Sequence, residues 1–291
     1  MKLYIIDQNL DVIGGVERVC NLLATELNKD YNVHVVSKTK NTINPFFNYG
    51  NIKINYLFDN TKKYKFKIIK KIIRFLTLHI KIKKMSNQFT KDDIVIFGRI
   101  YVALNFLPYI QNKENKPKII VRDAIHFQYF NNKIKSKILK YFPNTVDTLI
   151  VSSDESANEY KSHLKSSNMK ILKIYNPLGI KPIKKYKFEN KKIISIGRMD
   201  DNQKGYENLI NAMEIVNNNH PEWKLCIYGD GAYKEKYNTM ISELHANKYI
   251  EINSSIKNVV KKFNNSSIFI LSSRTEGYAN ILVEAMACGI P

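Results

Sequence analysis

The sequence lacks any long uncharged apolar run, and this absence excludes a chain that crosses a membrane through a helix. Nowhere among the 291 residues do about 18 apolar residues follow one another without a charge, which is the length that such a helix needs. The first residues, MKLYIID, are not followed by an apolar stretch with a small-residue cleavage site, so we expect no signal peptide.

Cysteine is scarce as well. The three residues, Cys20, Cys226 and Cys288, are odd in number and far apart, which fits neither a disulfide framework nor a zinc site. We therefore expect three core thiols in a protein of the reducing cytoplasm.

Acidic residues are few, because 26 Asp and Glu stand against 46 Lys and Arg and leave a net charge of +20. This excess favours an anionic partner, either nucleic acid, acidic lipid headgroups or a phosphorylated substrate. A biased base composition of the gene would enrich lysine too, so the charge alone does not choose among these partners. The apolar fraction of 44% is enough for real cores and excludes wholesale disorder.

Short runs rich in Ile and Val alternate with amphipathic segments of helical length, such as Val16–Leu27. The runs show little strict alternation, as in strands that are buried on both faces. This pattern predicts an α/β fold with parallel sheets wound by helices. The strands expected in the first part are Leu3–Asp7, Asn32–Ser37, Lys53–Leu57, Asp93–Phe97, Lys118–Arg122, Thr148–Ser152 and Ile171–Tyr175.

The pattern breaks at Asn176-Pro177-Leu178-Gly179 and then begins again, which predicts two domains. We expect a first domain at 1–176, a linker at 177–190 and a second domain at 191–291. The second domain should contain a helix over Asn280–Cys288 and the strands Lys192–Gly197, Lys224–Tyr228, Tyr249–Asn253 and Ser267–Ser272. A doubly wound domain usually has about five or six strands, so we expect this domain to be incomplete.

The strongest candidate site follows the last expected strand. Glu276 lies in the loop at the carboxyl end of that strand, where open α/β sheets bind ligands, and Gly277 lets the backbone approach a ligand. Glu284 follows inside the next helix, whose free N–H groups can hold an anion. Such a loop supplies one carboxylate for sugar hydroxyls, donors for phosphate and a second carboxylate for a ribose. The alternative is two solvated acids at a common spacing.

Two cations follow the first strand of the second domain. Arg198 lies at its carboxyl end, and Lys204 lies in the loop before the next helix. Fixed cations stabilise a diphosphate leaving group as its charge grows. In a chain with 46 basic residues, two ordinary surface cations are the alternative.

Two features of the first domain also lie where ligands bind. Gly14-Gly15 opens a helix after the first strand, although the third glycine of a dinucleotide fingerprint is missing. His126 follows the strand Lys118–Arg122 and can reach a sugar hydroxyl. For Gly14-Gly15, the alternative is a plain strand-to-helix turn. For His126, the alternative is a structural histidine.

The segment Tyr64–Met85 is basic and amphipathic. Ten Lys or Arg lie between Lys62 and Lys84 without an acid, and Phe66, Ile69, Ile73, Leu76 and Ile80 follow helical spacing. This predicts a helix that lies on an anionic membrane, where each basic residue contributes about 1 kcal/mol. The alternative is a surface helix with a solvated cationic face.

Taken together, the motifs resemble the retaining glycosyltransferases of group one, or family four, which have the GT-B fold. That fold consists of two Rossmann-like doubly wound parallel-sheet domains that face a cleft. Order and spacing agree along nearly the whole chain, and the last motif is the most specific. The matching motifs are Gly14-Gly15-Val16-Glu17-Arg18, Gly197-Arg198, Lys204-Gly205, Leu209-Ile210-Asn211-Ala212, Tyr228-Gly229-Asp230-Gly231 and Glu276-Gly277 with Glu284-Ala285-Met286-Ala287-Cys288-Gly289.

The resemblance implies a nucleotide sugar, by family frequency UDP-linked, as donor, and transfer with retention and without metal or other cofactor. The absence of an Asp-x-Asp motif agrees with metal independence. The acceptor is a saccharide or a lipid-linked saccharide in surface polysaccharide or glycolipid synthesis. By the same resemblance, Glu276 and His126 contact the transferred sugar as catalytic residues. The implied donor contacts are Gly15, Arg198, Lys204, Gly277, Tyr278, Ala279, Asn280 and Glu284.

We therefore expect a hexosyltransferase that is cytoplasmic and attached peripherally to the inner face of the cell membrane through Tyr64–Met85. Family members continue beyond Gly289-Ile290-Pro291, so a truncated remnant without activity is the alternative. A nucleic-acid-binding protein would also be basic, but no recognition motif appears, and we expect no such partner.

Overall fold

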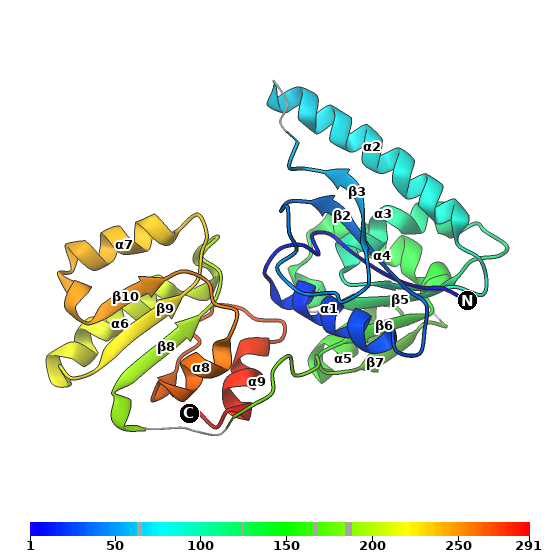
Figure 1. The fold of residues 1–291 in the computed structure, drawn as a ribbon. Coiled ribbons are helices and arrows are strands. Elements are labelled where there is room, and N and C mark those ends of the chain that lie inside the picture. Colours follow the sequence, from blue (N-terminus) through cyan, green and yellow to red (C-terminus); the bar gives the residue numbers. More distant parts are fainter. Residues whose placement is uncertain (63–65, 124, 166–167, 184–187) are drawn as a thin grey trace. The chain divides into compact units, whose positions relative to one another are not determined.

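The computed structural model describes residues 1–62, 66–123, 125–165, 168–183 and 188–291. It divides into two compact units, Met1–Pro177 and Leu178–Pro291 (Figure 1). Part of the predicted linker, residues 184–187, lies outside the described residues.

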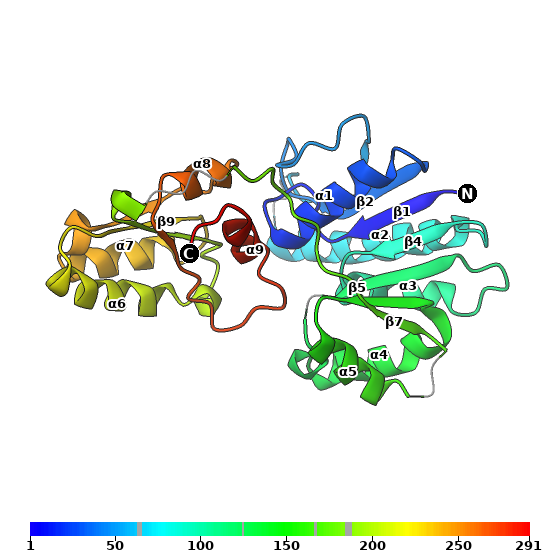
Figure 2. The ribbon, with the colours of Figure 1, turned by 90° about the horizontal axis from the view of Figure 1, so that it is seen from below.

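The first unit is built on a parallel sheet of seven strands in the order β3-β2-β1-β4-β5-β6-β7, and Figure 2 shows several of them side by side. The order reverses between β1 and β4, because β2 lies on one side of β1 and β4 on the other. The strands are β1 (Leu3–Asp7), β2 (Val33–Lys40), β3 (Ile54–Asp59), β4 (Ile94–Phe97), β5 (Lys118–Asp123), β6 (Thr148–Val151) and β7 (Lys170–Lys173).

A loop connects β2 to β3, helices connect the other consecutive strands, and the helices bury both faces of the sheet. One face packs on α1 through Leu3 and Ile5, and the other packs on α2, α3 and α4 through Tyr4 and Ile6. Both faces are apolar, which explains the continuous Ile and Val runs. The helices are α1 (Gly15–Leu27), α2 (Lys67–Gln88), α3 (Ile100–Ile110), α4 (Asn132–Thr145) and α5 (Asp154–His163), with a short 3₁₀ turn, η1 (Phe127–Tyr129).

The second unit has a parallel sheet of four strands in the order β10-β9-β8-β11. The strands are β8 (Lys192–Ile196), β9 (Lys224–Tyr228), β10 (Ile250–Asn253) and β11 (Ile268–Phe269). The 3₁₀ turn η2 (Phe188–Asn190) precedes β8, and α9 (Asn280–Ala287) follows β11. The elements between the strands are η3 (Asn202–Lys204), α6 (Tyr206–Asn219), α7 (Lys234–Glu243), η4 (Ala246–Lys248) and α8 (Val259–Asn264).

The predicted α/β class with parallel sheets is confirmed, and every expected strand is present within a few residues. The largest differences concern β2, which ends at Lys40 instead of Ser37, and β11, which ends at Phe269 instead of Ser272. After β11 the Ile270 N–H still donates to the carbonyl of Ile194 in β8 at 2.9 Å. The Ser272 hydroxyl then donates to the carbonyl of Lys204, in the loop after β8, at 2.7 Å.

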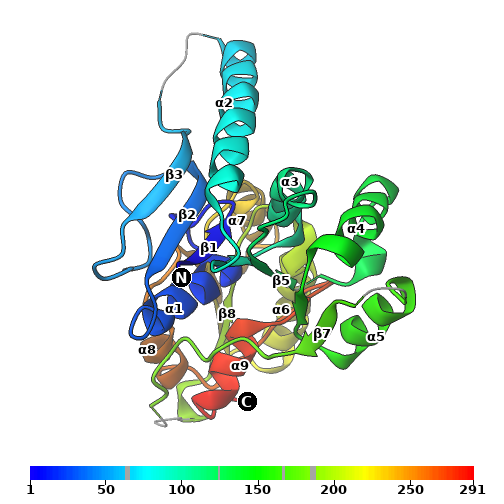
Figure 3. The same ribbon diagram turned by 90° about the vertical axis from the view of Figure 1, so that its right-hand side faces the viewer.

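Helix α2 corresponds to the basic segment, of which Tyr64 and Lys65 lie outside the described residues. Its last turns pack on the sheet through Ile82 and Met85. Its first turns extend past the sheet (Figures 1 and 3). They expose large apolar side chains, with Ile68 75% and Phe75 70% exposed. Within the described parts of the chain, no helix has the length and apolar character needed to cross a membrane.

Candidate functional site

The loops that follow β8 and β11 are joined by hydrogen bonds at the carboxyl edge of the second sheet. The backbone N–H of Arg274 donates to the carbonyl of Gln203 at 2.8 Å, and the Gln203 side chain donates to the carbonyl of Thr275 at 3.0 Å. The Ser272 hydroxyl adds its bond to Lys204. The two loops therefore form one rigid surface at the edge where open α/β sheets bind ligands.

Gly205 allows these loops to approach each other. It has a φ of 65°, in the left-handed region, between η3 and α6. A Cβ atom at this position would lie 2.2 Å from the carbonyl oxygen of Ser272. Both the backbone conformation and the space therefore require glycine.

Lys204 and Glu276 meet on this surface, 72 residues apart in the sequence. The Lys204 Nζ lies 2.6 Å from the Glu276 Oε1, and the two side chains are 17% and 23% exposed. The lysine stem passes over Gly197, where a Cβ atom would lie 3.2 Å from the lysine Cε. An ammonium group has three donors, and the pair leaves two of them, and the second carboxylate oxygen, for a ligand.

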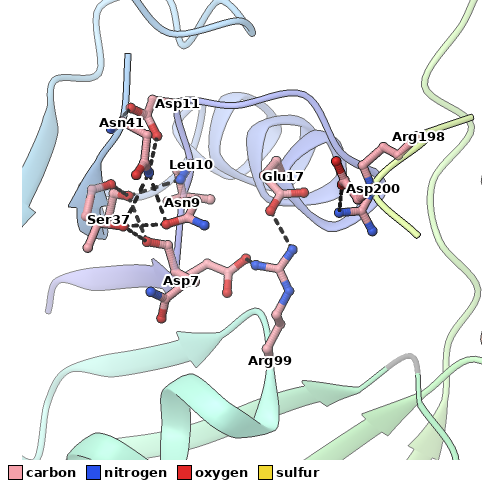
Figure 4. Close-up of polar contacts among 12 residues, drawn as sticks. Asp7, Asn9, Leu10, Asp11, Glu17, Ser37, Asn41, Arg99, Arg198 and Asp200 are labelled. Atoms are coloured by element: carbon pink, nitrogen blue, oxygen red, sulfur yellow. Dashed lines mark hydrogen bonds and ion pairs between the residues drawn. The ribbon is translucent and has the colours of Figure 1, made fainter. Parts of the chain in front are cut away.

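The structure does not bring Arg198 into this pair. Its guanidinium instead lies 3.3 Å from the carboxylate of Asp200, and both side chains are more than half exposed (Figure 4). A solvated pair of this kind contributes little stability, which leaves Arg198 free to exchange its partner for a ligand.

The remaining predicted residues of the second unit lie along one continuous segment. Glu284 is buried in α9, with 2% of its surface exposed. The segment that leads from Glu276 into α9 is half-buried and consists of Gly277, Tyr278, Ala279 and Asn280.

The loop after β9 packs tightly beside the loop after β8. A Cβ atom at Gly229 would lie 2.0 Å from the carbonyl oxygen of Gly197, so the two loops touch through their backbones. Asp230 fixes the loop, because its carboxylate accepts from the Ser255 N–H at 2.8 Å and from Lys234 at 2.9 Å. The backbone bond first, and then Lys234, lower the pKa of Asp230 to about 2.

The first unit holds a buried ionic cluster that the sequence analysis missed. Arg99, which follows β4, binds Asp7 at the end of β1 at 2.6 Å and Glu17 in α1 at 2.5 Å (Figure 4). Asp7 is fully buried and Glu17 is 5% exposed. Burial raises the pKa of Asp7 to about 6, although Arg99 opposes the rise. Charged residues at the carboxyl ends of the buried strands β1 and β4 were the signal that could have revealed this cluster.

The predicted Gly14-Gly15 turn lies against the same cluster. A Cβ atom at Gly14 would lie 2.0 Å from a carboxylate oxygen of Glu17. The absence of a side chain at Gly14 therefore leaves room for the Glu17 carboxylate. Asp11 anchors the loop before the turn, because its buried carboxylate accepts hydrogen bonds from the backbone N–H groups of Asn41 and Thr42 (Figure 4). Gly15 is the first residue of α1.

His126 lies at the carboxyl edge of the first sheet, directly before η1. Its Nδ1 is 3.3 Å from the Ser156 hydroxyl and 3.7 Å from the Glu159 carboxylate, and its ring packs edge-on against Tyr129. Its side chain is 14% exposed. These neighbours hold one ring nitrogen and fix the orientation of the imidazole.

Two other features give no candidate site. In the ranges that the structure describes, no group of three or more His, Cys, Asp or Glu is arranged to hold a metal ion. A cavity of about 340 Å³ opens beside Tyr4, His34 and Lys53 at the amino ends of β1, β2 and β3. It lies at the edge opposite to the one where such sheets bind ligands.

Comparison with known proteins finds glycosyltransferases among the similar sequences and structures. Residues 149–291 match the model of the family described as "Glycosyl transferases group 1". An uncharacterized glycosyltransferase of Haemophilus influenzae is 26% identical over 286 residues, with 97% of this chain and 77% of that protein covered. A Campylobacter jejuni enzyme, N-acetylgalactosamine-N,N'-diacetylbacillosaminyl-diphospho-undecaprenol 4-alpha-N-acetylgalactosaminyltransferase, is 24% identical, with 94% and 75% covered.

The solved structures show the fold. The pneumococcal O-GlcNAc transferase GtfA, in complex with UDP and GlcNAc, aligns with all of this chain and 83% of its own, with a TM-score of 0.74 and 13% identity. The chain therefore has the GT-B class of fold, as the resemblance predicted.

Proposed function

We propose that this chain, whose residues 149–291 belong to the glycosyl transferases group 1 family, transfers a hexose or N-acetylhexosamine from a UDP-sugar to a saccharide or lipid-linked acceptor. The observation that carries this proposal is the Lys204–Glu276 pair at the carboxyl edge of the second sheet. The similar structure with bound UDP and GlcNAc supports the donor, and the name of the Campylobacter relative supports an acceptor in glycolipid synthesis.

The pair suits a sugar diphosphate because it holds a cation and an acid side by side. Glu276 fixes the Lys204 ammonium, so the remaining N–H groups are already oriented toward the oxygens of a diphosphate. The free carboxylate oxygen of Glu276 accepts from the hydroxyls of the sugar. Since the leaving diphosphate gains charge during transfer, a fixed cation stabilises the transition state more than the ground state.

The other predicted donor residues extend this site. Arg198, whose pairing with Asp200 is solvated, adds a second cation to the diphosphate. Glu284 binds the ribose, and the segment Gly277–Asn280 gives backbone donors ahead of α9. With two cations for the leaving group, we propose transfer without a metal ion, and with retention. Gly15 and His126 lie in the first unit. The contact of Gly15 with the donor and that of His126 with the transferred sugar remain predictions.

Donor hydrolysis tests this function. UDP-glucose, UDP-galactose, UDP-N-acetylglucosamine and UDP-N-acetylgalactosamine are incubated with the full chain, and release of UDP is measured. We expect release from at least one donor, and strong loss in Glu276→Gln and Lys204→Ala. The anomeric configuration of the transferred sugar, read by NMR, tests retention. No release from any donor, with the variants equal to the original chain, would refute the proposal.

We further propose that the enzyme works at the inner face of the cell membrane and that α2 attaches it there. Apolar side chains such as Ile68, Ile72 and Phe75 are exposed in the first turns, and lysines flank them. An interfacial helix combines these two features. Co-sedimentation with anionic vesicles should exceed that with neutral vesicles and should fall in Ile72→Asp. Equal binding to both vesicle types would rule out this attachment.

A further inference from the structure

Glu159 lies in the middle of α5 and joins that helix to the turn η1. Its carboxylate oxygens accept hydrogen bonds from two successive backbone N–H groups, that of Phe127 at 3.0 Å and that of Gln128 at 2.7 Å. These two residues open η1. Glu159 therefore fixes the backbone immediately after His126.

The same carboxylate faces one nitrogen of the His126 ring. The Nδ1 atom lies 3.7 Å from the Glu159 Oε2 and 3.3 Å from the Ser156 hydroxyl. Ser156 and Glu159 are three residues apart in α5, so their side chains leave the same side of the helix. The ring of Tyr129 packs edge-on against the imidazole, with the centroids 5.9 Å apart. Both polar contacts reach Nδ1, and neither uses Nε2.

A carboxylate beside Nδ1 determines which ring nitrogen of a neutral histidine carries the proton. The two side chains are only 14% and 19% exposed, so water screens the charge of Glu159 weakly. This negative charge attracts an N–H group and repels a lone pair, which favours the tautomer with the proton on Nδ1. The Nε2 atom of that tautomer is an acceptor, whereas in the other tautomer it is a donor.

We propose that Glu159 is a positioning residue of the transfer reaction and acts through His126. Its carboxylate holds the proton on Nδ1, and Nε2 then accepts a hydrogen bond from a hydroxyl of the transferred sugar. This inference rests on the proposed function, because it takes from that function the sugar that His126 contacts. A neutral side chain at position 159 leaves both tautomers populated, so part of the molecules lose the acceptor.

The first test reads the tautomer directly. Nitrogen-15 NMR of the full chain with labelled histidine distinguishes protonated from unprotonated ring nitrogens, and His126→Ala identifies the signals of His126 among the six histidines. At about pH 8, where histidine is ordinarily neutral, we expect a protonated Nδ1 in the original chain. Glu159→Gln should move much of the population to the other tautomer, and Glu159→Asp, which keeps the charge, should not. A proton on Nε2 in the original chain would overturn the inference.

The second test is a double-mutant cycle on hydrolysis of the UDP-sugar that the chain cleaves fastest. Loss of one hydrogen bond should make Glu159→Gln about 10-fold slower, with unchanged affinity for UDP, which lacks the sugar. In the His126→Ala background the same substitution should have no further effect, because no ring remains to be oriented. The matched control, Glu155→Gln, removes an exposed acid from the first turn of α5 and should leave the rate unchanged.

The outcomes separate a positioning role from a structural one. Equal loss of rate with His126 present and absent would mean that Glu159 only holds η1 in place, and would overturn the inference. Equal loss in Glu159→Asp and Glu159→Gln, or no loss in Glu159→Gln, would overturn it as well. Absence of UDP release from every donor in the original chain would instead overturn the proposed function and the sugar contact with it, and the NMR signals still decide whether Glu159 holds the proton.

Discussion

Replacing Gly205 by alanine tests whether the loops after β8 and β11 build the donor site together. An L-residue at a φ of 65° costs about 1–2 kcal/mol. The added Cβ atom would also lie 2.2 Å from a backbone oxygen of Ser272, and overpacking of this kind costs about 1–3 kcal/mol. We therefore expect Gly205→Ala to lower the free energy of unfolding of the second unit by about 2–5 kcal/mol.

The chain offers a matched control in the same unit. Gly289 has a φ of 76°, but a Cβ atom there would meet nothing within 4 Å. Gly289→Ala should therefore cost only the conformational part, about 1–2 kcal/mol. The single tryptophan, Trp223, lies before β9 and reports the unfolding of this unit by its fluorescence in urea.

The two variants should also differ in ligand binding. Since Gly205→Ala pushes the Ser272 loop away from Lys204, it should separate Lys204 from Glu276 and weaken UDP binding, and Gly289→Ala should leave the affinity unchanged. Equal destabilisation by the two substitutions, with equal affinity for UDP, would refute the reasoning.

Three further predictions concern the first unit. Arg99→Met should lower stability by about 3–5 kcal/mol, because it leaves Asp7 and Glu17 buried without their cation; hydrogen exchange of the β1 amides would measure this loss. Asp7 has a folded-state pKa of about 6, above its ordinary value, so its ionisation opposes folding. The contribution of Asp7 to the free energy of unfolding should therefore decrease as the pH rises from about 4 to about 6. The stability difference between the original chain and Asp7→Asn, followed across this range, should therefore fall by about 3 kcal/mol, and a flat difference would contradict the raised pKa. Tyr160→Phe should cost about 1–3 kcal/mol in thermal unfolding, because it removes the buried hydrogen bond to Asp123, and an unchanged melting curve would contradict this.

The strands could be predicted because burial on both faces gives a strong local signal. Leu3–Asp7 and Lys224–Tyr228 were predicted with the bounds that the structure has. The end of β11 could not be predicted from the local pattern, because the residues after it bond to distant segments, such as Ser272 to Lys204, 68 residues away in sequence. Periodicity also located α2 but could not show that only its last turns pack on the sheet.

The candidate site shows the same limit. Sequence position placed Lys204 and Glu276 at the ligand edge, but their contact depends on the turn at Gly205 and on the hydrogen bonds between the two loops. Arg198 has the same sequence signal as Lys204, yet it points to solvent and pairs with Asp200. Rotamer and loop geometry decide such differences, and neither is encoded in a short motif.

Calorimetric titration of the full chain with UDP tests the central claim most directly. The Lys204–Glu276 pair predicts saturable binding that is weakened about 10-fold or more in Lys204→Met, since a charge-assisted hydrogen bond is lost. Lys224→Met, which removes an exposed lysine from the opposite edge of the same sheet, should bind UDP like the original chain. Binding that is absent, or that is equally strong in Lys204→Met, would contradict the assignment of this edge as the donor site.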